Sequence, residues 1–151
     1  EQEDTEDVLS ESSKSLENAI AYAEKIISQA IALRDQNSGN KNRSILKTAV
    51  DFIDSHYTEE DMSLNKAANA ANVSANHFSA LFSQNMGQTF IEYLTNLRMN
   101  KAKEYLRCTS MRSSEIAGEI GYKDAHYFSY LFKKTQGMTP SDYRKAREDK
   151  A

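Results

Sequence analysis

Hydrophobic residues recur at helical spacing along most of the chain, and no segment alternates apolar and polar residues in the way that strands require. Residues 8–34 are an example, because their apolar side chains repeat every seven residues in two interleaved series. The first series is Leu9, Leu16, Ala23 and Ala30, and the second is Ile20 and Ile27, preceded at the same spacing by the polar Ser13. With one proline and five glycines in 151 residues, few positions interrupt a helix. The pattern predicts an all-α protein.

The predicted helix at 8–34 has two explanations, and the sequence leaves both open. Its apolar seam could pair with a second copy of the chain as a short coiled coil, or it could pack against a domain N-terminal to this sequence. The alanines in the seam would make a free-standing zipper weak. Residues 35–42 read DQNSGNKN, a cluster of turn-forming residues that predicts a linker and a domain boundary. We therefore predict that residues 1–40 are a linker segment with an amphipathic helix.

Seven further helices are predicted in the second domain, residues 44–147. Apolar side chains at positions 45, 49, 52 and 53, followed by the histidine at 56, line one face of the first of them. The last begins at a Thr-Pro pair, because proline is favoured in the first turn of a helix. The predicted helices are 44–57, 63–71, 74–85, 89–108, 113–120, 124–136 and 139–147.

An internal repeat organises this second domain. Residues 78–89 read FSALFSQNMGQT and residues 128–139 read FSYLFKKTQGMT, with six identical positions at a separation of 50 residues. Upstream, at a separation of 49, Asn72 corresponds to Gly121, and both fall between two short predicted helices. Glycine and asparagine are the residues that enter the left-handed backbone region most readily, so each position predicts a tight turn.

Each copy of the repeat therefore predicts a helix, a tight turn and a second helix. This is the size and order of a DNA-binding helix-turn-helix, and the two units span about 63–87 and 113–137. The ends of the helices are predicted from capping residues. Ser63, Ser74 and Asp124 are the predicted N-caps, and Gly87 and Gly137 are the predicted helix stops.

A long helix at 89–108 joins the two units. Twenty residues at about 1.5 Å each span roughly 30 Å. Successive major grooves on one side of B-DNA lie about 34 Å apart. The sequence therefore predicts that this helix can present two recognition helices to neighbouring grooves.

Residues 116–144 read IAGEIGYKDAHYFSYLFKKTQGMTPSDYR and resemble the signature of the AraC/XylS family of bacterial transcription regulators. The matching positions are Ile116-Ala117, Gly121-Tyr122, Tyr127-Phe128, Phe132-Lys133-Lys134, Gly137, Thr139-Pro140 and Tyr143-Arg144. The resemblance covers about residues 44–147 and implies a seven-helix DNA-binding domain. The 8–34 helix and the stretch ALRDQNSGNKNR are similar to the linker of YesN-type two-component response regulators, which implies a receiver domain N-terminal to this sequence.

Direct contacts with DNA are predicted on the outward face near the start of each second helix, and the resemblance implies the same positions. The predicted base-facing residues are Ala75, Asn76, Ser79, Ala80, Ser83, Ala125, His126, Ser129 and Tyr130. Asparagine can bond adenine through two hydrogen bonds, and alanine can contact a thymine methyl group. Simple solvent exposure is the alternative for each of them. Many family members carry arginine at positions 80 and 130, so the alanine and tyrosine here remove two strong guanine contacts.

Phosphate contacts are predicted from lysines and from helix N-termini. The predicted phosphate-binding residues are Lys66, Ser74, Thr89, Lys123, Lys133, Lys134 and Thr139, and the helix start at Ser63 is a further candidate. Lys133 also lies on the outward face of its helix. Arg98 and Arg144 fall within apolar helical patterns, which favours structural ion pairs. The Phe-x-x-Leu-Phe stripes at 78–82 and 128–132 are typical of packing against a core.

The net charge of −3 is atypical of a DNA-binding protein, but the charge is unevenly distributed. Residues 1–40 hold three basic and nine acidic residues, a net charge of −6, whereas residues 41–151 hold 16 basic and 13 acidic ones, a net charge of +3. The single cysteine, Cys108, cannot form an internal disulfide and fits a reducing cytoplasm. No apolar run approaches the length of a membrane span.

The sequence predicts no enzyme, metal or cofactor. Its three histidines, His56, His77 and His126, are scattered, and no base is recognisable beside Cys108. We expect a cytoplasmic transcription regulator whose partner is double-stranded promoter DNA, with a homodimer through residues 8–34 and RNA polymerase as further candidate partners. The alternative is a protein-interaction module that does not bind DNA, although this leaves the duplicated helix-turn-helix unexplained.

Overall fold

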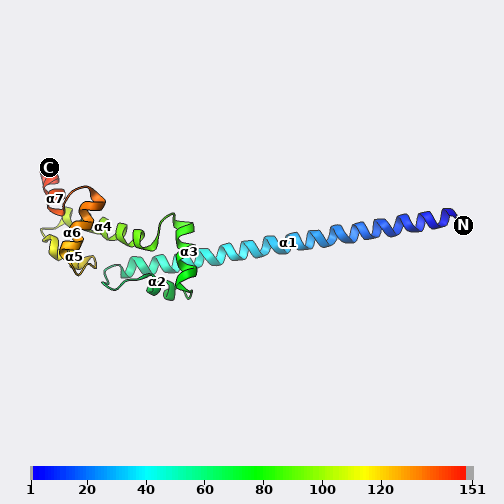
Figure 1. Cartoon of the computed structure of the whole chain (residues 1–151), viewed down its shortest axis with the longest axis horizontal. Coiled ribbons are helices and arrows are strands. Elements are labelled where there is room, and N and C mark those ends of the chain that lie inside the picture. The colour runs from blue at the N-terminus through cyan, green and yellow to red at the C-terminus, as the bar shows by residue number, and fades with distance from the viewer. Residues whose placement is uncertain (1, 149–151) are drawn as a thin grey trace. The chain divides into compact units, whose positions relative to one another are not determined.

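The computed structural model describes the backbone of residues 2–148 and the side chains of residues 16–146, and within this part of the chain it contains seven helices and no strand. The prediction of an all-α protein with two helix-turn-helix units is confirmed. The helices are α1 (Gln2–His56), α2 (Leu64–Ala70), α3 (Ala75–Met86), α4 (Phe90–Cys108), α5 (Ser113–Glu119), α6 (Ala125–Gln136) and α7 (Pro140–Glu148) (Figure 1).

The predicted linker at 35–42 is wrong, because α1 runs through it without interruption. Two predicted helices, 8–34 and 44–57, are therefore one. The reason is that breaking a helix creates two new ends with unsatisfied backbone groups and requires a second nucleation. This stretch has no proline, and its single glycine, Gly39, costs only about 1 kcal/mol in a helix interior. The chain nevertheless divides into two compact parts, Glu1–Arg43 and Ser44–Ala151.

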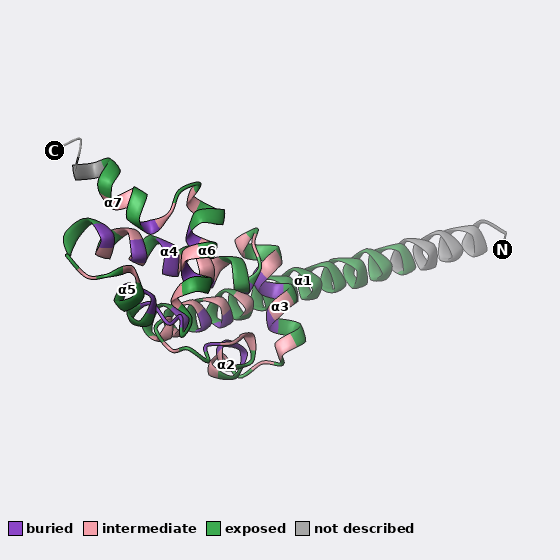
Figure 2. Cartoon of the chain, turned by 60° about the vertical axis from the view of Figure 1, so that its left-hand side comes forward, coloured by how far each residue is buried: buried purple, intermediate pink, exposed green. Residues whose placement is uncertain are grey.

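The N-terminal part consists of helix α1 up to Arg43, and its residues 16–41 are exposed to solvent (Figure 2). The apolar residues of the predicted seam are among them: the exposed fractions are 63% for Leu16, 52% for Ile20 and 58% for Ile27. Leu9 and Ser13, the first members of the two series, lie outside the residues whose side chains are described.

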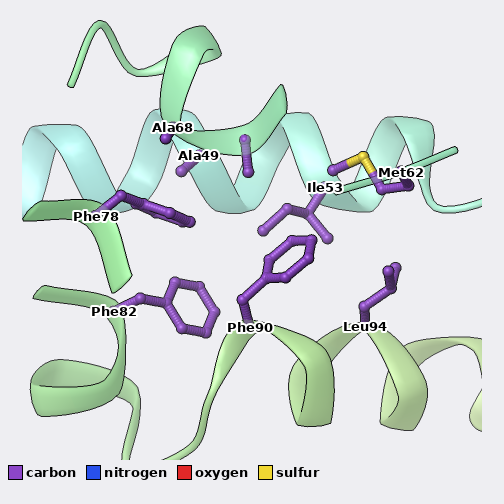
Figure 3. Close-up of a cluster of buried hydrophobic side chains, with 9 residues drawn as sticks. Ala49, Ile53, Met62, Ala68, Phe78, Phe82, Phe90 and Leu94 are labelled. Carbon is purple, nitrogen blue, oxygen red and sulfur yellow. The ribbon is translucent and has the colours of Figure 1, made fainter. Parts of the chain in front are cut away.

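Two hydrophobic cores hold the C-terminal part, Ser44–Ala151, together, and α4 contributes to both. The first core combines the C-terminal part of α1 with α2, α3 and the beginning of α4. In Figure 3, Phe78 and Phe82 from α3 point toward Ile53 of α1 and Phe90 of α4. The second core combines the end of α4 with α5, α6 and Tyr143 of α7. One helix therefore connects two separately packed helix-turn-helix units.

The predicted phenylalanine stripes are confirmed as core. Phe78, Phe82, Phe128 and Phe132 are completely buried. The intervening Leu81 and Leu131 differ: the first is buried and the second only partly buried. Because these side chains occupy one face of α3 and one face of α6, they orient the opposite face of each helix toward solvent.

The predicted structural ion pairs of Arg98 and Arg144 are wrong, because both guanidinium groups donate to backbone carbonyls. Arg98 donates to Tyr57 and Glu59, at 2.8 and 2.7 Å, and Arg144 donates to Met111 at 2.6 Å. A carbonyl oxygen is present at every residue, so the sequence offers no charge pattern from which such a partner could be predicted. The two arginines are structural, as expected, but through a different interaction.

Two other features are absent from the part of the chain that the structure describes. No helix there is long and apolar enough to cross a membrane. No group of three or more histidine, cysteine, aspartate or glutamate side chains there is placed to hold a metal ion.

Candidate nucleic-acid interface

The two tight turns have the same backbone geometry, as the repeat predicts. Asn72 and Gly121 both adopt left-handed backbone angles, with φ of 54° and 86°. The next N–H in each unit donates back to the same position of the preceding helix: Val73 to Ala68 at 3.0 Å, and Tyr122 to Ala117 at 2.8 Å. The shared hydrogen bonds fix the same reversal of direction between α2 and α3 as between α5 and α6.

The second helix of each unit starts and stops as predicted. The side chain of Ser74 accepts the N–H of His77 at the start of α3, and Asp124 accepts the N–H groups of His126 and Tyr127 at the start of α6. Gly87 and Gly137 end these helices with left-handed φ angles of 66° and 79°. The two candidate recognition helices are therefore matched in length, at 12 residues each.

Asn76, Ala80 and Ser83 lie on the side of α3 away from Phe78 and Phe82, since successive residues are about 100° apart around an α-helix. Ala75, another predicted base-facing residue, packs against the first core instead. Asn76 and Ala80 are exposed, whereas Ala75, Ser79 and Ser83 are half-buried. This region has room for a base edge because four of the five predicted side chains are no larger than serine and the helix itself carries no charged residue. It offers hydrogen bonds but no cation.

The corresponding face of α6 is larger and positively charged. His126, Tyr130 and Lys133 are exposed, and Tyr130 is the largest of them at 61% exposure. Ser129 is half-buried, and its hydroxyl donates to the carbonyl of Ala125 at 2.9 Å, which leaves the oxygen as an acceptor. The remaining predicted position, Ala125, is half-buried and packs against the second core. With Lys134 and Lys123 also exposed, the electrostatic attraction for phosphate is concentrated on the second unit.

Lys66, a predicted phosphate ligand, is bound within its own unit. Its ammonium group forms salt bridges with Glu59 at 2.9 Å and with Asp61 at 2.6 Å. Hydrogen bonds to these two carboxylates raise the pKa of Lys66, first from Asp61 and then from Glu59. A phosphate would have to displace both of them, so Lys66 is poorly placed to add affinity for DNA.

The helix starts at Thr89 and Thr139 are likewise occupied by carboxylates of the protein. Glu92 accepts from the N–H of Thr89 at 2.7 Å and from its hydroxyl at 2.9 Å, and these hydrogen bonds lower the pKa of Glu92. Asp142 accepts from the hydroxyl of Thr139 at 2.6 Å. Both ends thus carry a negative charge where the sequence predicts a phosphate.

The sequence contains the signal for these carboxylates, although the prediction of phosphate sites did not use it. Thr-x-x-Glu at 89–92 and Thr-x-x-Asp at 139–142 follow the spacing of a capping box, in which the first and fourth residues satisfy each other's N–H groups. A carboxylate at that spacing occupies the helix N-terminus itself. Glu59 and Asp61 could be recognised only as part of an acidic break between helices.

Residues 67–146, just over half of the chain, match the family of helix-turn-helix domains. Among curated proteins, the chain is 36% identical over 99 residues to the lactose operon transcription activator of Staphylococcus xylosus, which covers 66% of this chain and 35% of that protein. The chain spans between 12% and 38% of the length of three curated relatives that it matches.

Solved structures that are similar to this chain at more than 30% identity include two response-regulator domains. The C-terminal domain of AraT, a response regulator from Geobacillus stearothermophilus, is 39% identical with a TM-score of 0.66, and the match covers 68% of this chain and 84% of that one. The C-terminal domain of the two-component response regulator yesN from Fusobacterium nucleatum is 34% identical with a TM-score of 0.63, and the match covers 65% of this chain and 95% of that one.

Proposed function

The chain belongs to the AraC-type family of helix-turn-helix transcription regulators, and from this premise we propose that α3 and α6 enter two successive major grooves of double-stranded DNA. The observation that supports the proposal is the duplicated turn and helix, with an outward face on α3 and on α6 and one helix, α4, between the two units. At about 1.5 Å per residue, the 19 residues of α4 span roughly 28 Å, close to the groove repeat of about 34 Å. No catalytic step is part of this proposal.

Base recognition is assigned to the residues near the start of the two helices that the sequence predicts. In the first unit these are Ala75, Asn76, Ser79, Ala80 and Ser83, and in the second they are Ala125, His126, Ser129 and Tyr130. The first group is uncharged and small, which suits close approach to base edges. His126 can donate to guanine or to a phosphate. Lys123, Lys133 and Lys134 supply the attraction to phosphates, to which Ser74 and the amide groups at the start of α3 can contribute.

Asn76→Ala is expected to change the base preference at one position of the DNA site, because the carboxamide can form two hydrogen bonds to an adenine edge. The measurement is a selection from a pool of randomised duplexes with the wild-type chain and the variant. Asn85→Ala is the matched control, since Asn85 lies on the other side of α3 and its amide donates to the carbonyl of Leu81 at 2.8 Å. If both variants select the same sites as the wild type, Asn76 does not recognise a base. If the wild type enriches no site at all, the proposed sequence-specific binding is wrong.

Glu92→Gln is expected to strengthen DNA binding about two- to fivefold if a phosphate lies at the start of α4, because the variant removes a negative charge from that helix end. Glutamine still fits the capping box. The matched control is Glu115→Gln, since Glu115 accepts the N–H of Arg112 at 2.6 Å in the same way at the start of α5, where no phosphate is proposed. Dissociation constants for one duplex at fixed salt provide the measurement. Equal changes in both variants would remove Thr89, and by analogy Thr139, from the phosphate-binding set.

We also propose that the chain is the output domain of a cytoplasmic two-component response regulator. This rests on the similarity to the C-terminal domains of AraT and yesN, both of which are response regulators. RNA polymerase is the partner that a promoter-bound regulator would contact. Residues 8–34 are proposed to form a homodimer, which would place two copies of the DNA-binding unit on one duplex.

Ile20→Asn combined with Ile27→Asn is expected to shift the chain from dimer to monomer, because both side chains are exposed in α1 and lie in the same heptad series. Sedimentation over a range of concentrations measures the change. Tyr22→Asn is the control, since Tyr22 is 69% exposed but lies outside both heptad series. A wild-type chain that stays monomeric at every concentration, or a double variant that sediments like the wild type, would contradict the proposed homodimer.

A further inference from the structure

Five residues of α4, each four positions after the last, form a row. Four of them are hydrophobic, and the middle one is charged. Phe90 and Leu94 belong to the first core, and Ala102 and Leu106 belong to the second. Between them lies Arg98, which is 6% exposed. The row advances by about 40° with each step of four residues, because a helix has roughly 3.6 residues per turn. The two cores therefore pack on different sides of α4, and Arg98 lies where one core gives way to the other.

The guanidinium group of Arg98 forms hydrogen bonds with the loop that precedes the first helix-turn-helix unit. Its Nε donates to the carbonyl of Tyr57 at 2.8 Å, and its Nη2 donates to the carbonyl of Glu59 at 2.7 Å. Both carbonyls lie just beyond the end of α1, in the loop that leads to α2. Burying a guanidinium is costly unless its donors are satisfied, so these bonds hold the loop firmly against α4.

The same guanidinium also contacts the tight turn of the second unit. Its carbon lies 4.9 Å from the centre of the Tyr122 ring, a cation–π geometry. Gly121 approaches so closely that a Cβ atom there would lie 2.6 Å from Nη2 of Arg98, and 2.8 Å from the carbonyl oxygen of Tyr57. The α5–α6 turn, the end of α1 and the middle of α4 thus meet at one side chain.

We propose that Arg98 is a positioning residue that fixes the separation and rotation of α3 relative to α6, and thereby sets the spacing between the two sequence boxes that the protein recognises in DNA. This inference rests on the proposed function, because it assumes that both helices enter the DNA. Each base pair of spacing moves one box by about 3.4 Å and turns it by roughly 35° around the duplex. A rigid junction accepts one spacing, whereas a loose junction accepts several.

The DNA test compares duplexes whose boxes are separated by the selected spacing and by one base pair more or less. The wild-type chain is expected to lose about tenfold in affinity with each changed spacing, because the DNA has to be twisted to fit. Arg98→Met, which keeps the side-chain length without the charge, is expected to bind the three duplexes within about threefold of one another while selecting the same bases within each box. An unchanged spacing preference in a folded Arg98→Met variant would overturn the proposal.

Arg144→Met is the matched control. Arg144 also donates to a backbone carbonyl, that of Met111, but both residues lie within the second unit. This variant is expected to lower the thermal unfolding temperature without changing the spacing preference. Should Arg98→Met fail to fold, Tyr122→Leu removes the stacking contact and keeps the hydrogen bonds to Tyr57 and Glu59. That variant is expected to relax the spacing preference in the same direction, and a preference equal to the wild type's would contradict the proposal.

A measurement without DNA separates this inference from the proposed function. Spin labels at positions 80 and 130, in a chain with Cys108→Ser, report the distance between α3 and α6 by pulsed electron paramagnetic resonance. The wild-type background and the Arg144→Met background are expected to give one narrow distance distribution, and Arg98→Met a broad one. A distribution that stays narrow in Arg98→Met would refute the positioning role, even if the chain binds DNA. A broad distance distribution in Arg98→Met, together with a wild-type chain that binds no DNA, would support the positioning role of Arg98 and contradict the proposed function.

Discussion

Gly121→Ala is expected to destabilise the unit Ser44–Ala151 by about 3 kcal/mol or more, because it combines left-handed backbone strain with a collision. The φ angle of Gly121 is 86°, and a Cβ atom would lie 2.6 Å from Nη2 of Arg98, 2.8 Å from the carbonyl oxygen of Tyr57 and 2.9 Å from that of Thr58. Two of these three atoms belong to the backbone and cannot move aside. The measurement is the free energy of unfolding in urea.

Gly137→Ala is the matched control for this prediction. Gly137 has a similar φ angle, 79°, but a Cβ atom there would meet nothing within 4 Å. This variant is expected to lose only the backbone term, about 1 to 2 kcal/mol. Equal losses for the two glycines would show that the close approach to Arg98 and Tyr57 costs nothing, and that Gly121 is needed for its backbone angle alone.

The position of Gly121 in a turn could be predicted from the sequence, but its neighbours could not. The repeat aligns Gly121 with Asn72, and both residues have a positive φ angle, as a tight turn between two helices requires. Such turns are set by residues close together in the chain. The contact with Tyr57 joins residues more than 60 positions apart, and it depends on how both cores pack against α4. No local pattern contains that information.

The ends of the helices could be predicted from the sequence, whereas the continuation of α1 through residues 35–42 could not. Ser74, Asp124 and Gly137 are residues whose side chain or backbone freedom satisfies a helix end directly, so their type indicates their role. Asn and Ser at 37 and 38 are weak helix formers, and a weak preference is outweighed by the cost of starting a helix again. Composition therefore predicted a linker where cooperativity maintains a helix.

The candidate site was predictable as a surface and less so as a set of partners. The outward positions of α3 and α6 follow from helical spacing once the phenylalanines are assigned to the core, which explains why Asn76, His126 and Tyr130 are exposed as expected. Whether a lysine is free depends instead on the acids that fold next to it. Lys66 has two such partners from the preceding loop, and this contact required the structure.

Lys133→Ala combined with Lys134→Ala is expected to lower the slope of log affinity against log salt concentration by about 2, because each lysine that contacts a phosphate releases roughly 0.9 counterion. Both side chains are exposed on α6, whereas α3 carries no charged residue. The second unit should therefore account for most of the salt dependence. Titrations of one duplex at several salt concentrations provide the slopes, and affinity should fall for specific and non-specific duplexes alike.

Lys66→Ala is the control that makes this result interpretable. Lys66 is also a lysine at the start of a helix-turn-helix, but its salt bridges of 2.9 Å to Glu59 and 2.6 Å to Asp61 already neutralise it. Its removal exposes those two carboxylates and releases no phosphate contact, so the salt slope should stay close to that of the wild type while affinity falls modestly through repulsion. If Lys66→Ala lowers the slope as much as one of the α6 lysines does, the ammonium exchanges its carboxylates for a phosphate when DNA binds. The two units would then share the electrostatic attraction, and the charge asymmetry of the free protein would not survive in the complex.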